Sequence, residues 1–142
     1  MRILRFFRFH ARFGEGELDK AALEACTARA NDLMALSRER IADELLKLLA
    51  LADPTQTVAL MIARGIFAPV LPEVVEAERL KSLIAAESEG GFEPDAIRRL
   101  SALFPQVPAT AEAMAARLKL SNKARKRIGL AADKDLSANP QA

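Results

Sequence analysis

The chain has 142 residues and a formal net charge of +2, with 51% hydrophobic and 28% charged residues, so we expect a folded domain rather than a disordered chain. Aromatic residues make up 5%, all of them Phe, and β-branched residues are scarce, which favours helices over a sheet. One cysteine (Cys26) and one histidine (His10) exclude a disulfide framework and a Cys/His zinc site, and no apolar run approaches the ~20 residues of a membrane span.

Residues that start and end helices divide the N-terminal half into four short helices. Capping side chains precede three of them, at Asp19, Ser37 and Asp53. Gly14 follows the first helix and Gly65 follows the fourth, at positions where helices commonly end. The helices expected from these signals run over residues 2–13, 20–30, 38–51 and 54–64.

The same signals predict four further helices in the C-terminal half. Prolines at 69, 72 and 105 and the glycine pair at 90 and 91 interrupt the chain, and Ser121 caps a final basic helix. The expected helices lie near 76–87, from about 94 to before 105, over 111–118 and over 122–131. Residues 133–142 form a polar, flexible tail. The predicted fold class is therefore all-α, a compact array of seven to eight short helices.

The first helix carries the most informative pattern. At 100° per residue, Arg5, Arg8 and Arg12 form a stripe about 60° wide, and apolar side chains, Phe9 among them, cover well over half of the circumference. A mostly buried helix that presents only guanidinium groups to one cleft is typical of a site for phosphate or a planar base, which arginine binds bidentately.

Other interpretations of this helix stay open. Its basic and apolar start is similar to a mitochondrial presequence, although the enrichment in serine is missing. Another interpretation pairs its arginines with acidic side chains of the middle segment. His10 lies on the apolar side, where a core residue is more common than a catalyst.

The charge is segregated along the chain. Residues 1–13 carry a net +4, residues 14–116 a net −7 and residues 117–127 a net +6. Two basic poles around an acidic middle suggest phosphate contacts at both ends. Charge counts alone are equally consistent with basic side chains that only solvate the surfaces of helices.

Four segments in order resemble a known family. Residues 2–14 read RILRFFRFHARFG, which resembles the neck helix of bacterial class II tRNA nucleotidyltransferases, the CCA-adding enzymes, and of their poly(A) polymerase relatives. Residues 36–49, 65–73 and 117–122 resemble later landmarks of the same family, so that the match spans roughly residues 2–130. Each motif alone is moderately specific, whereas four in consistent order are strong.

The resemblance implies nucleotide contacts for Arg2 and Arg5, which align with the templating arginine and the next nucleotide-contacting arginine. The acidic pair that precedes the templating arginine in the family is absent, because Met1 stands just before Arg2. Base selection is therefore expected to fail. No segment resembles the catalytic head, whose carboxylates hold Mg²⁺. We expect no catalytic residue, metal site or cofactor in this chain, and Mg²⁺ and ATP or CTP would belong to the complete family enzyme.

The resemblance also implies RNA as the partner, either tRNA or another structured RNA, with a separate catalytic head chain as a second candidate. Phosphate contacts need only positive charge within reach. The RNA-binding residues expected from the two basic poles are Arg8, Arg12, Lys119, Lys123, Arg125, Lys126 and Arg127. Glu39, Arg40 and Glu44 are expected to support the neck helices, with a plain surface salt bridge as the alternative. No aromatic residue is interleaved at the C-terminal pole, so base stacking is not indicated there.

These inferences divide the chain into a neck-like region (1–65), a body-like region (66–132) and a tail (133–142). The expected function is RNA binding in tRNA 3′-end processing, without catalysis by this chain alone, in a cytoplasmic protein that has no membrane partner. The alternative is a helical protein-interaction module without nucleotide chemistry, which predicts an exposed Phe-rich side on the first helix. An independent small enzyme, resting on His10 and scattered acidic residues, ranks last. Asp43 and Glu44 are expected to be surface or ion-pair groups and not metal ligands.

Overall fold

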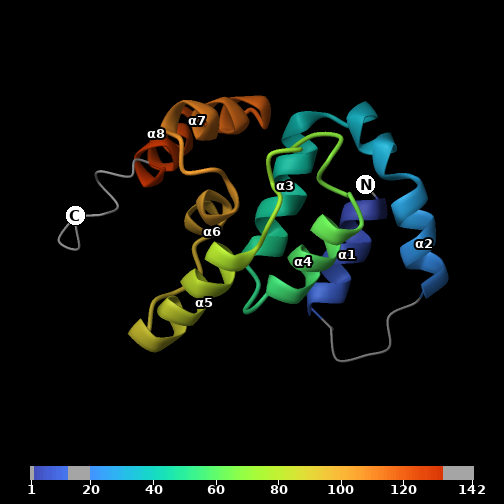
Figure 1. Cartoon of the computed structure of the whole chain (residues 1–142), viewed down its shortest axis with the longest axis horizontal. Helices are drawn as coiled ribbons and strands as arrows, with labels where there is room; N and C mark the ends of the chain where they lie inside the picture. Colours follow the sequence, from blue (N-terminus) through green and yellow to red (C-terminus); the bar gives the residue numbers. More distant parts are fainter. Residues whose placement is uncertain (1, 13–19, 133–142) are drawn as a thin grey trace.

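A computed structural model describes residues 2–12 and 20–132. Within these residues the chain forms eight α-helices, one 3₁₀-helix (η1) and no strand, which confirms the all-α prediction (Figure 1). In chain order the elements are α1 (Arg2–Arg12), α2 (Lys20–Ala28), η1 (Ala30–Ala35), α3 (Arg38–Leu49), α4 (Thr55–Ala63), α5 (Glu78–Gly90), α6 (Ala96–Leu103), α7 (Pro108–Arg117) and α8 (Asn122–Ala131).

Local capping explains several of the helix ends. The Ser37 hydroxyl accepts a hydrogen bond from the Arg40 amide at 3.2 Å, and the Ser121 hydroxyl accepts one from the Ala124 amide at 3.1 Å, as predicted. Gly65 ends α4 with a φ of +71°, in the left-handed region that favours glycine. The predicted cap at Asp19 and the predicted tail lie outside the described residues.

The elements differ from the sequence prediction at several points. α7 begins at Pro108, three residues before the expected start, because proline at the first helical position has a suitable φ and needs no amide partner. α5 begins at Glu78 and continues to Gly90, beyond the expected end at 87. η1 was not predicted. It is a short 3₁₀-helix whose two buried residues, Ala30 and Leu33, lie three positions apart, and one such pair is too short a pattern to indicate a helix.

α3 occupies the centre of the molecule. It contacts α1 on one side and α6 on the other, while α6 in turn contacts α5 and α8 (Figure 1). Its Leu45, Leu48 and Leu49 are at most 2% exposed and belong to a core that includes buried residues from both the neck-like and the body-like region. The division at residue 65 is therefore a prediction about function, since a single core passes through it.

A buried arginine closes the C-terminal end of α3. Arg99, on α6, is 2% exposed, and its Nη1 donates to the carbonyl oxygens of Leu49, at 2.6 Å, and of Leu51. Its Nε donates to Glu87 of α5 at 2.9 Å, and Glu87 is itself 4% exposed. The positive charge therefore meets both a carboxylate and the negative end of the α3 dipole. This network joins α3, α5 and α6.

Candidate nucleic-acid interface

α1 presents a mixed arginine and phenylalanine face to solvent. Ile3, Leu4 and Phe7 are buried in the core, whereas Arg5 and Arg12 are exposed. The helical pattern assigned Phe9 to the apolar covered side, which is wrong, because its ring is 51% exposed. Phe9 extends from the side opposite to the buried residues. The side chain of Arg2 is outside the described part of the structure.

Arg8 forms an ion pair within the protein. Its Nη1 lies 3.3 Å from Oε2 of Glu44 on α3, and the two side chains are 24% and 6% exposed. The ion pair joins α1 to α3, so the interpretation in which arginines of this helix pair with middle-segment acids holds for Arg8. It also gives Glu44 a supporting position between the two helices.

His10 lies at the contact between α1 and α4. Its Nδ1 is 2.6 Å from the hydroxyl oxygen of Thr57, which is 2% exposed, and the imidazole itself is half-buried. This arrangement agrees with the interpretation of His10 as a packed residue rather than a catalyst.

The exposed stripe of α3 lies between α1 and the C-terminal helices. Arg40, Asp43 and Lys47 lie along it, and Asp43 pairs with Lys47 at 2.9 Å. Glu39, one residue before Arg40, lies 3.6 Å from Nζ of Lys119, and both side chains are more than half exposed. Its own backbone amide and Lys119 lower the pKa of Glu39. Arg40 forms no ion pair with another described residue.

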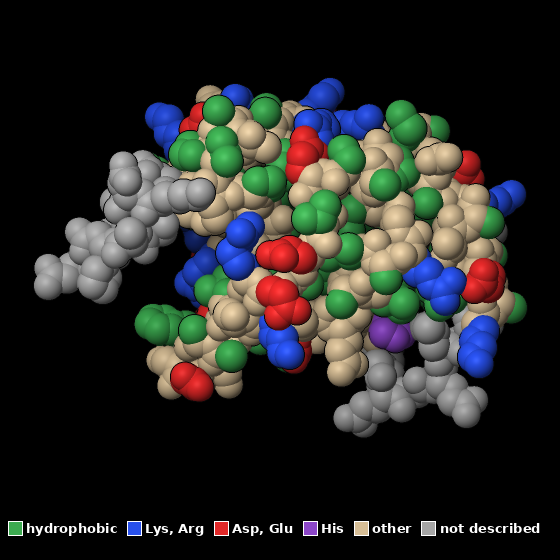
Figure 2. All heavy atoms as spheres, viewed as in Figure 1, with side chains coloured by type: hydrophobic (Ala, Val, Ile, Leu, Met, Phe, Trp, Pro, Cys, Tyr) green, Lys and Arg blue, Asp and Glu red, His purple; other side chains and the backbone are tan. Residues whose placement is uncertain are grey.

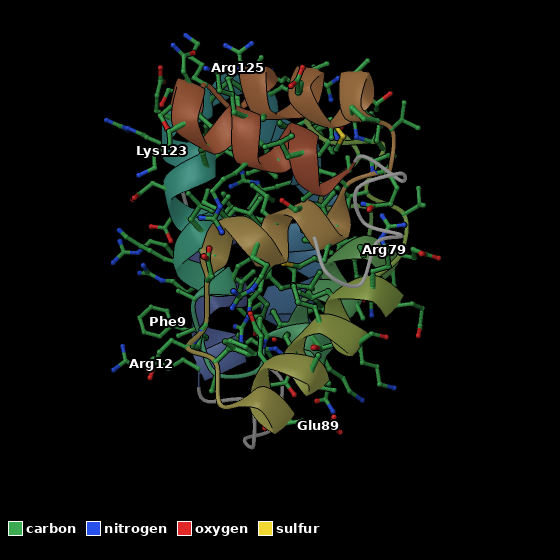
Figure 3. The ribbon with its side chains drawn as sticks, turned by 90° about the vertical axis from the view of Figure 1, so that its left-hand side faces the viewer. Phe9, Arg12, Arg79, Glu89, Lys123 and Arg125 are labelled. Atoms are coloured by element: carbon green, nitrogen blue, oxygen red, sulfur yellow. The ribbon has the colours of Figure 1, made fainter. Side chains whose placement is uncertain are left out.

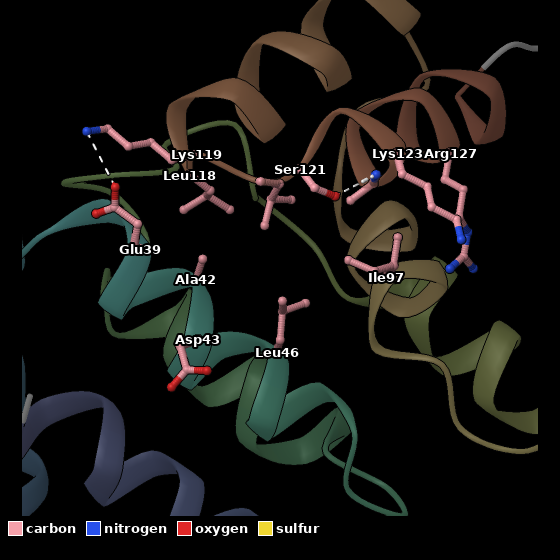
Figure 4. A pocket seen from close by; sticks show the side chains of 12 residues that line it. Glu39, Ala42, Asp43, Leu46, Ile97, Leu118, Lys119, Ser121, Lys123 and Arg127 are labelled. Carbon is pink, nitrogen blue, oxygen red and sulfur yellow. Dashed lines mark hydrogen bonds and ion pairs between the residues drawn. The ribbon is translucent and has the colours of Figure 1, made fainter.

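A groove of about 480 Å³ separates α3 from α8 (Figure 4). Its apolar floor includes Leu46 of α3 and Ile97 of α6, which face one another across it. Cationic side chains edge it at Lys119, in the turn before α8, and at Lys123 and Arg127 on α8. Lys119 has a φ of 56°, the left-handed conformation that ends α7 and begins this turn.

The cations of the C-terminal pole differ in how strongly other residues hold them. Arg127 donates from Nη2 to Oδ2 of Asp95 at 2.7 Å. Arg125 is half-buried, with Nη1 3.5 Å from Oδ1 of Asn122. Lys123 and Lys126 are exposed and form no ion pair with a described residue. These two lysines are therefore the cations of this pole that an external phosphate reaches without breaking an existing contact.

Asp95 connects α6 to the C-terminal pole. Its side chain caps α6 by accepting from the Arg98 amide at 3.1 Å, in addition to its ion pair with Arg127. Burial alone would raise the pKa of Asp95, but the hydrogen bonds from Arg127 and Arg98, and the charges of both, outweigh it and lower the pKa.

Acidification is expected to destabilise the wild-type protein more than an Asp95→Asn variant. The asparagine amide oxygen still caps α6, but it carries no charge for Arg127. Because the pKa of Asp95 is lower in the folded protein, its contribution is present above the unfolded pKa and is lost as the pH falls through the folded pKa. Thermal unfolding midpoints followed by circular dichroism from about pH 6 to about pH 2.5 measure this difference. Parallel curves for the two proteins would contradict it.

We define the basic face as the exposed surface formed by α1, the outer stripe of α3 and the groove edge. Phe9 and Arg12 of α1 and Lys123 of α8 point outward from the same side of the molecule (Figure 3). The cations of the basic face are Arg5, Arg12, Arg40, Lys47, Lys119, Lys123, Lys126 and Arg127. The acids that touch these cations, Glu39, Asp43 and Asp95, each lie in an ion pair with one of them, and the cations outnumber them, so the surface has a net positive charge. The face seen in Figure 2 instead mixes acidic, basic and apolar side chains.

The described residues contain no group of three His, Cys, Asp or Glu side chains placed to hold a metal ion. Asp43 and Glu44 point to different partners, a lysine on the same helix and Arg8 on α1. The Mg²⁺ on which the family's chemistry depends therefore does not fit the carboxylates of the described segments. Within these segments, no helix has the length and apolar character needed to cross a membrane.

Sequence reasoning missed two features of this surface. The groove floor brings Leu46 and Ile97 together from positions 51 residues apart, and no local pattern predicts that meeting. Arg117 was counted in the basic pole, but it donates to both carboxylate oxygens of Glu73 at 2.8 and 2.9 Å and to the Val70 carbonyl. This pairing lowers the pKa of Glu73 and raises that of Arg117. Arg117 is therefore a structural residue.

Comparison with known proteins finds two similarities. Residues 17–78 match a family model described as the probable RNA and SrmB-binding site of polymerase A. Over 133 residues the chain is 32% identical to a mouse (Mus musculus) protein named CCA tRNA nucleotidyltransferase 1, mitochondrial. That alignment covers 92% of this chain and 30% of the relative, so the chain spans about three tenths of the length of that curated protein.

Proposed function

Because this chain carries the neck and body region of the CCA-adding enzyme and poly(A) polymerase family, we propose that it binds structured RNA, in the first place tRNA, through the basic face. The region with the RNA-binding description extends over α2, η1, α3 and α4, and α3 forms the centre of this face. The proposal places the RNA along α3, between the cations of α1 and those of α8.

The observation that carries the proposal is the separation of paired from available cations. Arg8 joins α1 to α3 through its ion pair with the buried Glu44. Arg117 joins α7 to the segment between α4 and α5 through its bidentate pair with Glu73. Arg5, Lys123 and Lys126 are exposed and form no ion pair with a described residue. Exposed cations whose charge is not neutralised by neighbouring acids give a positive surface, and such a surface attracts the phosphate backbone of a nucleic acid.

The role proposed for this region is to hold RNA for nucleotidyl transfer at the tRNA 3′ end. Arg5 is proposed to contact the incoming nucleotide in the complete enzyme, together with Arg2. Mg²⁺ would supply charge stabilisation for phosphoryl transfer there. Since the described carboxylates do not fit that metal, we propose that this region positions RNA and that other parts of such an enzyme perform the chemistry.

Equilibrium binding to a fluorescent tRNA that lacks its CCA end tests the proposal. The wild-type protein is expected to bind, and its affinity is expected to fall steeply between about 50 mM and about 200 mM salt as condensed counterions are released. A Lys123→Ala, Lys126→Ala variant is expected to bind roughly ten- to fiftyfold more weakly near 0.1 M salt, with a shallower salt dependence.

The matched control removes the same charge elsewhere. Lys20 and Lys81 are exposed on α2 and α5, two helices that do not contribute to the basic face as defined above, so a Lys20→Ala, Lys81→Ala variant should bind as the wild type does. Equal weakening in both variants would mean that net charge alone drives binding. If the folded wild-type protein bound no tRNA at low salt, the RNA-binding proposal would be wrong.

The half-exposed Phe9 ring favours a second candidate function, a helical module that binds a protein partner. Exposed apolar side chains on an otherwise folded surface mark interaction sites when they are grouped. Here Phe9 lies among arginines and not among other exposed apolar residues of α1, so RNA is the better-supported partner. Absence of RNA binding by the folded chain would leave this alternative as the better account.

A further inference from the structure

Two helix faces form the walls of the groove between α3 and α8 (Figure 4). The α8 wall carries Lys123 and Arg127, which are about one helical turn apart. Both helices pack against α6, whose Ile97 lies in the floor. The α3 wall consists of side chains spaced as on one face of a helix, at Glu39, Ala42, Asp43 and Leu46. A further helix laid along the groove would therefore meet a helix face on each side and α6 below.

The floor of the groove is apolar. Leu118 and Ala42 are buried where they line it, whereas Leu46 and Ile97 are half-buried and keep part of their surface in water. Removing apolar surface from water is favourable, and a ribose-phosphate backbone offers no apolar group with which to cover it. None of the described residues that line the groove is aromatic, so a nucleobase finds no ring to stack on. The floor therefore fits the apolar side chains of a polypeptide better than RNA.

The two edges of the groove differ in charge. On the α8 edge, Lys123 is exposed and forms no ion pair with a described residue, and Arg127 is held in position by Asp95 at 2.7 Å. The α3 edge carries the carboxylates of Glu39 and Asp43, each in an ion pair with a lysine. A further carboxylate is therefore attracted to the α8 edge and not to the α3 edge. The complementary ligand is acidic along one flank only.

We propose that this groove binds an amphipathic helix of a protein partner, with its apolar stripe on Leu46 and Ile97 and its acidic side chains along the flank that faces α8. Carboxylates four residues apart on such a helix are about 6 Å apart along its axis, as are two side chains four residues apart on α8, Lys123 and Arg127. Helices that bind in grooves are recognised through apolar anchors at this kind of spacing. The inference goes beyond the RNA proposal and does not depend on it.

A displayed library of helical peptides, randomised on one face, tests the inference. Peptides selected on the wild-type protein are expected to carry an apolar stripe flanked on one side by Asp or Glu. The tightest of them, labelled with a fluorophore, is expected to bind the Lys123→Glu variant roughly tenfold more weakly than the wild type, because the charge opposite its acids is reversed. A copy of the peptide with Gln in place of its acids is expected to bind the wild type roughly tenfold more weakly as well.

Lys126→Glu is the matched control. Lys126 is exposed on the same helix and forms no ion pair with a described residue, but it is not among the residues that line the groove. Its reversal should change the affinity for the peptide by no more than about twofold, while both variants should bind tRNA more weakly than the wild type does. Both positions are on the surface, so the two variants should unfold at the temperature of the wild type, which a circular dichroism melt checks.

Three results would overturn the inference. One is a selection that enriches no peptide above the bare support, and another is a set of enriched peptides without the acidic flank. The third is equal weakening by Lys123→Glu and Lys126→Glu, which would show general charge attraction and no seating in the groove. None of these measurements needs RNA, so a failure of the RNA proposal is seen separately, in the tRNA titrations.

Discussion

Replacement of Arg99 with methionine is expected to lower the free energy of unfolding by about 3–5 kcal/mol, the usual effect of removing one partner of a buried ion pair. The substitution leaves Glu87, 4% exposed, with a charge that only Arg98 then neutralises. It also leaves the carbonyls of Leu49 and Leu51 at the end of α3 without their donor. Urea denaturation followed by circular dichroism measures the loss.

Two further variants separate the buried charge from the general loss of an arginine. Arg99→Met combined with Glu87→Met removes both charges and is expected to restore part of the stability, because no unpaired carboxylate stays inside. Arg79→Met is the control, since Arg79 also donates to carbonyl groups at a helix end, those of Ala102 and Phe104, but is exposed. An Arg99→Met protein as stable as the Arg79→Met protein would show that the buried network contributes little.

Simultaneous replacement of Arg5, Arg40, Lys123 and Lys126 with alanine is expected to weaken tRNA binding by about a thousandfold near 0.1 M salt. All four side chains are exposed on the basic face, and none forms an ion pair with a described residue. Their loss therefore removes phosphate contacts without breaking a contact that supports the fold. Fluorescence anisotropy over a salt series measures both the affinity and the slope, which should become shallower by about three.

The two pairs measured separately show whether one RNA spans the face. If it does, the losses caused by the Arg5/Arg40 pair and by the Lys123/Lys126 pair should multiply to the loss of the fourfold variant. The control replaces four cations elsewhere with alanine, namely Lys20, Arg29, Arg64 and Lys81. A control as weak as the fourfold variant would contradict the assignment of the basic face.

Much of the fold follows from short-range signals in the sequence. Ser37 and Ser121 start helices, and Gly65 and Gly91 end them, because capping and left-handed φ are decided by a few neighbouring residues. The roles of Arg98 and Arg99 could not be predicted in this way. They are adjacent, chemically identical and both paired with Glu87, yet one is partly exposed and the other is buried. The difference arises because Arg99 also donates to the carbonyl of Leu49 at the end of α3, 50 residues away.

The candidate site was predictable in composition but not in detail. Charge segregation indicates two basic poles, and in the structure Arg12 of one and Lys123 of the other point outward from the same side of the molecule (Figure 3). The sequence does not distinguish Arg8 from Arg5, because the distinction depends on Glu44, 36 residues after Arg8. Nor does helical periodicity alone predict the exposure of Phe9, since that depends on which neighbours cover α1.

The buried arginine network also bears on how the two poles act together. By joining the end of α3 to α5 and α6, Arg99 fixes α6, and with it the contact between α6 and α8, relative to the helix that carries Arg40. The distance between the cations of α1 and those of α8 is then a property of the folded protein and does not have to be established during binding. Such preorganisation confines the entropy loss on binding largely to the RNA. It favours ligands whose phosphate spacing already matches the protein.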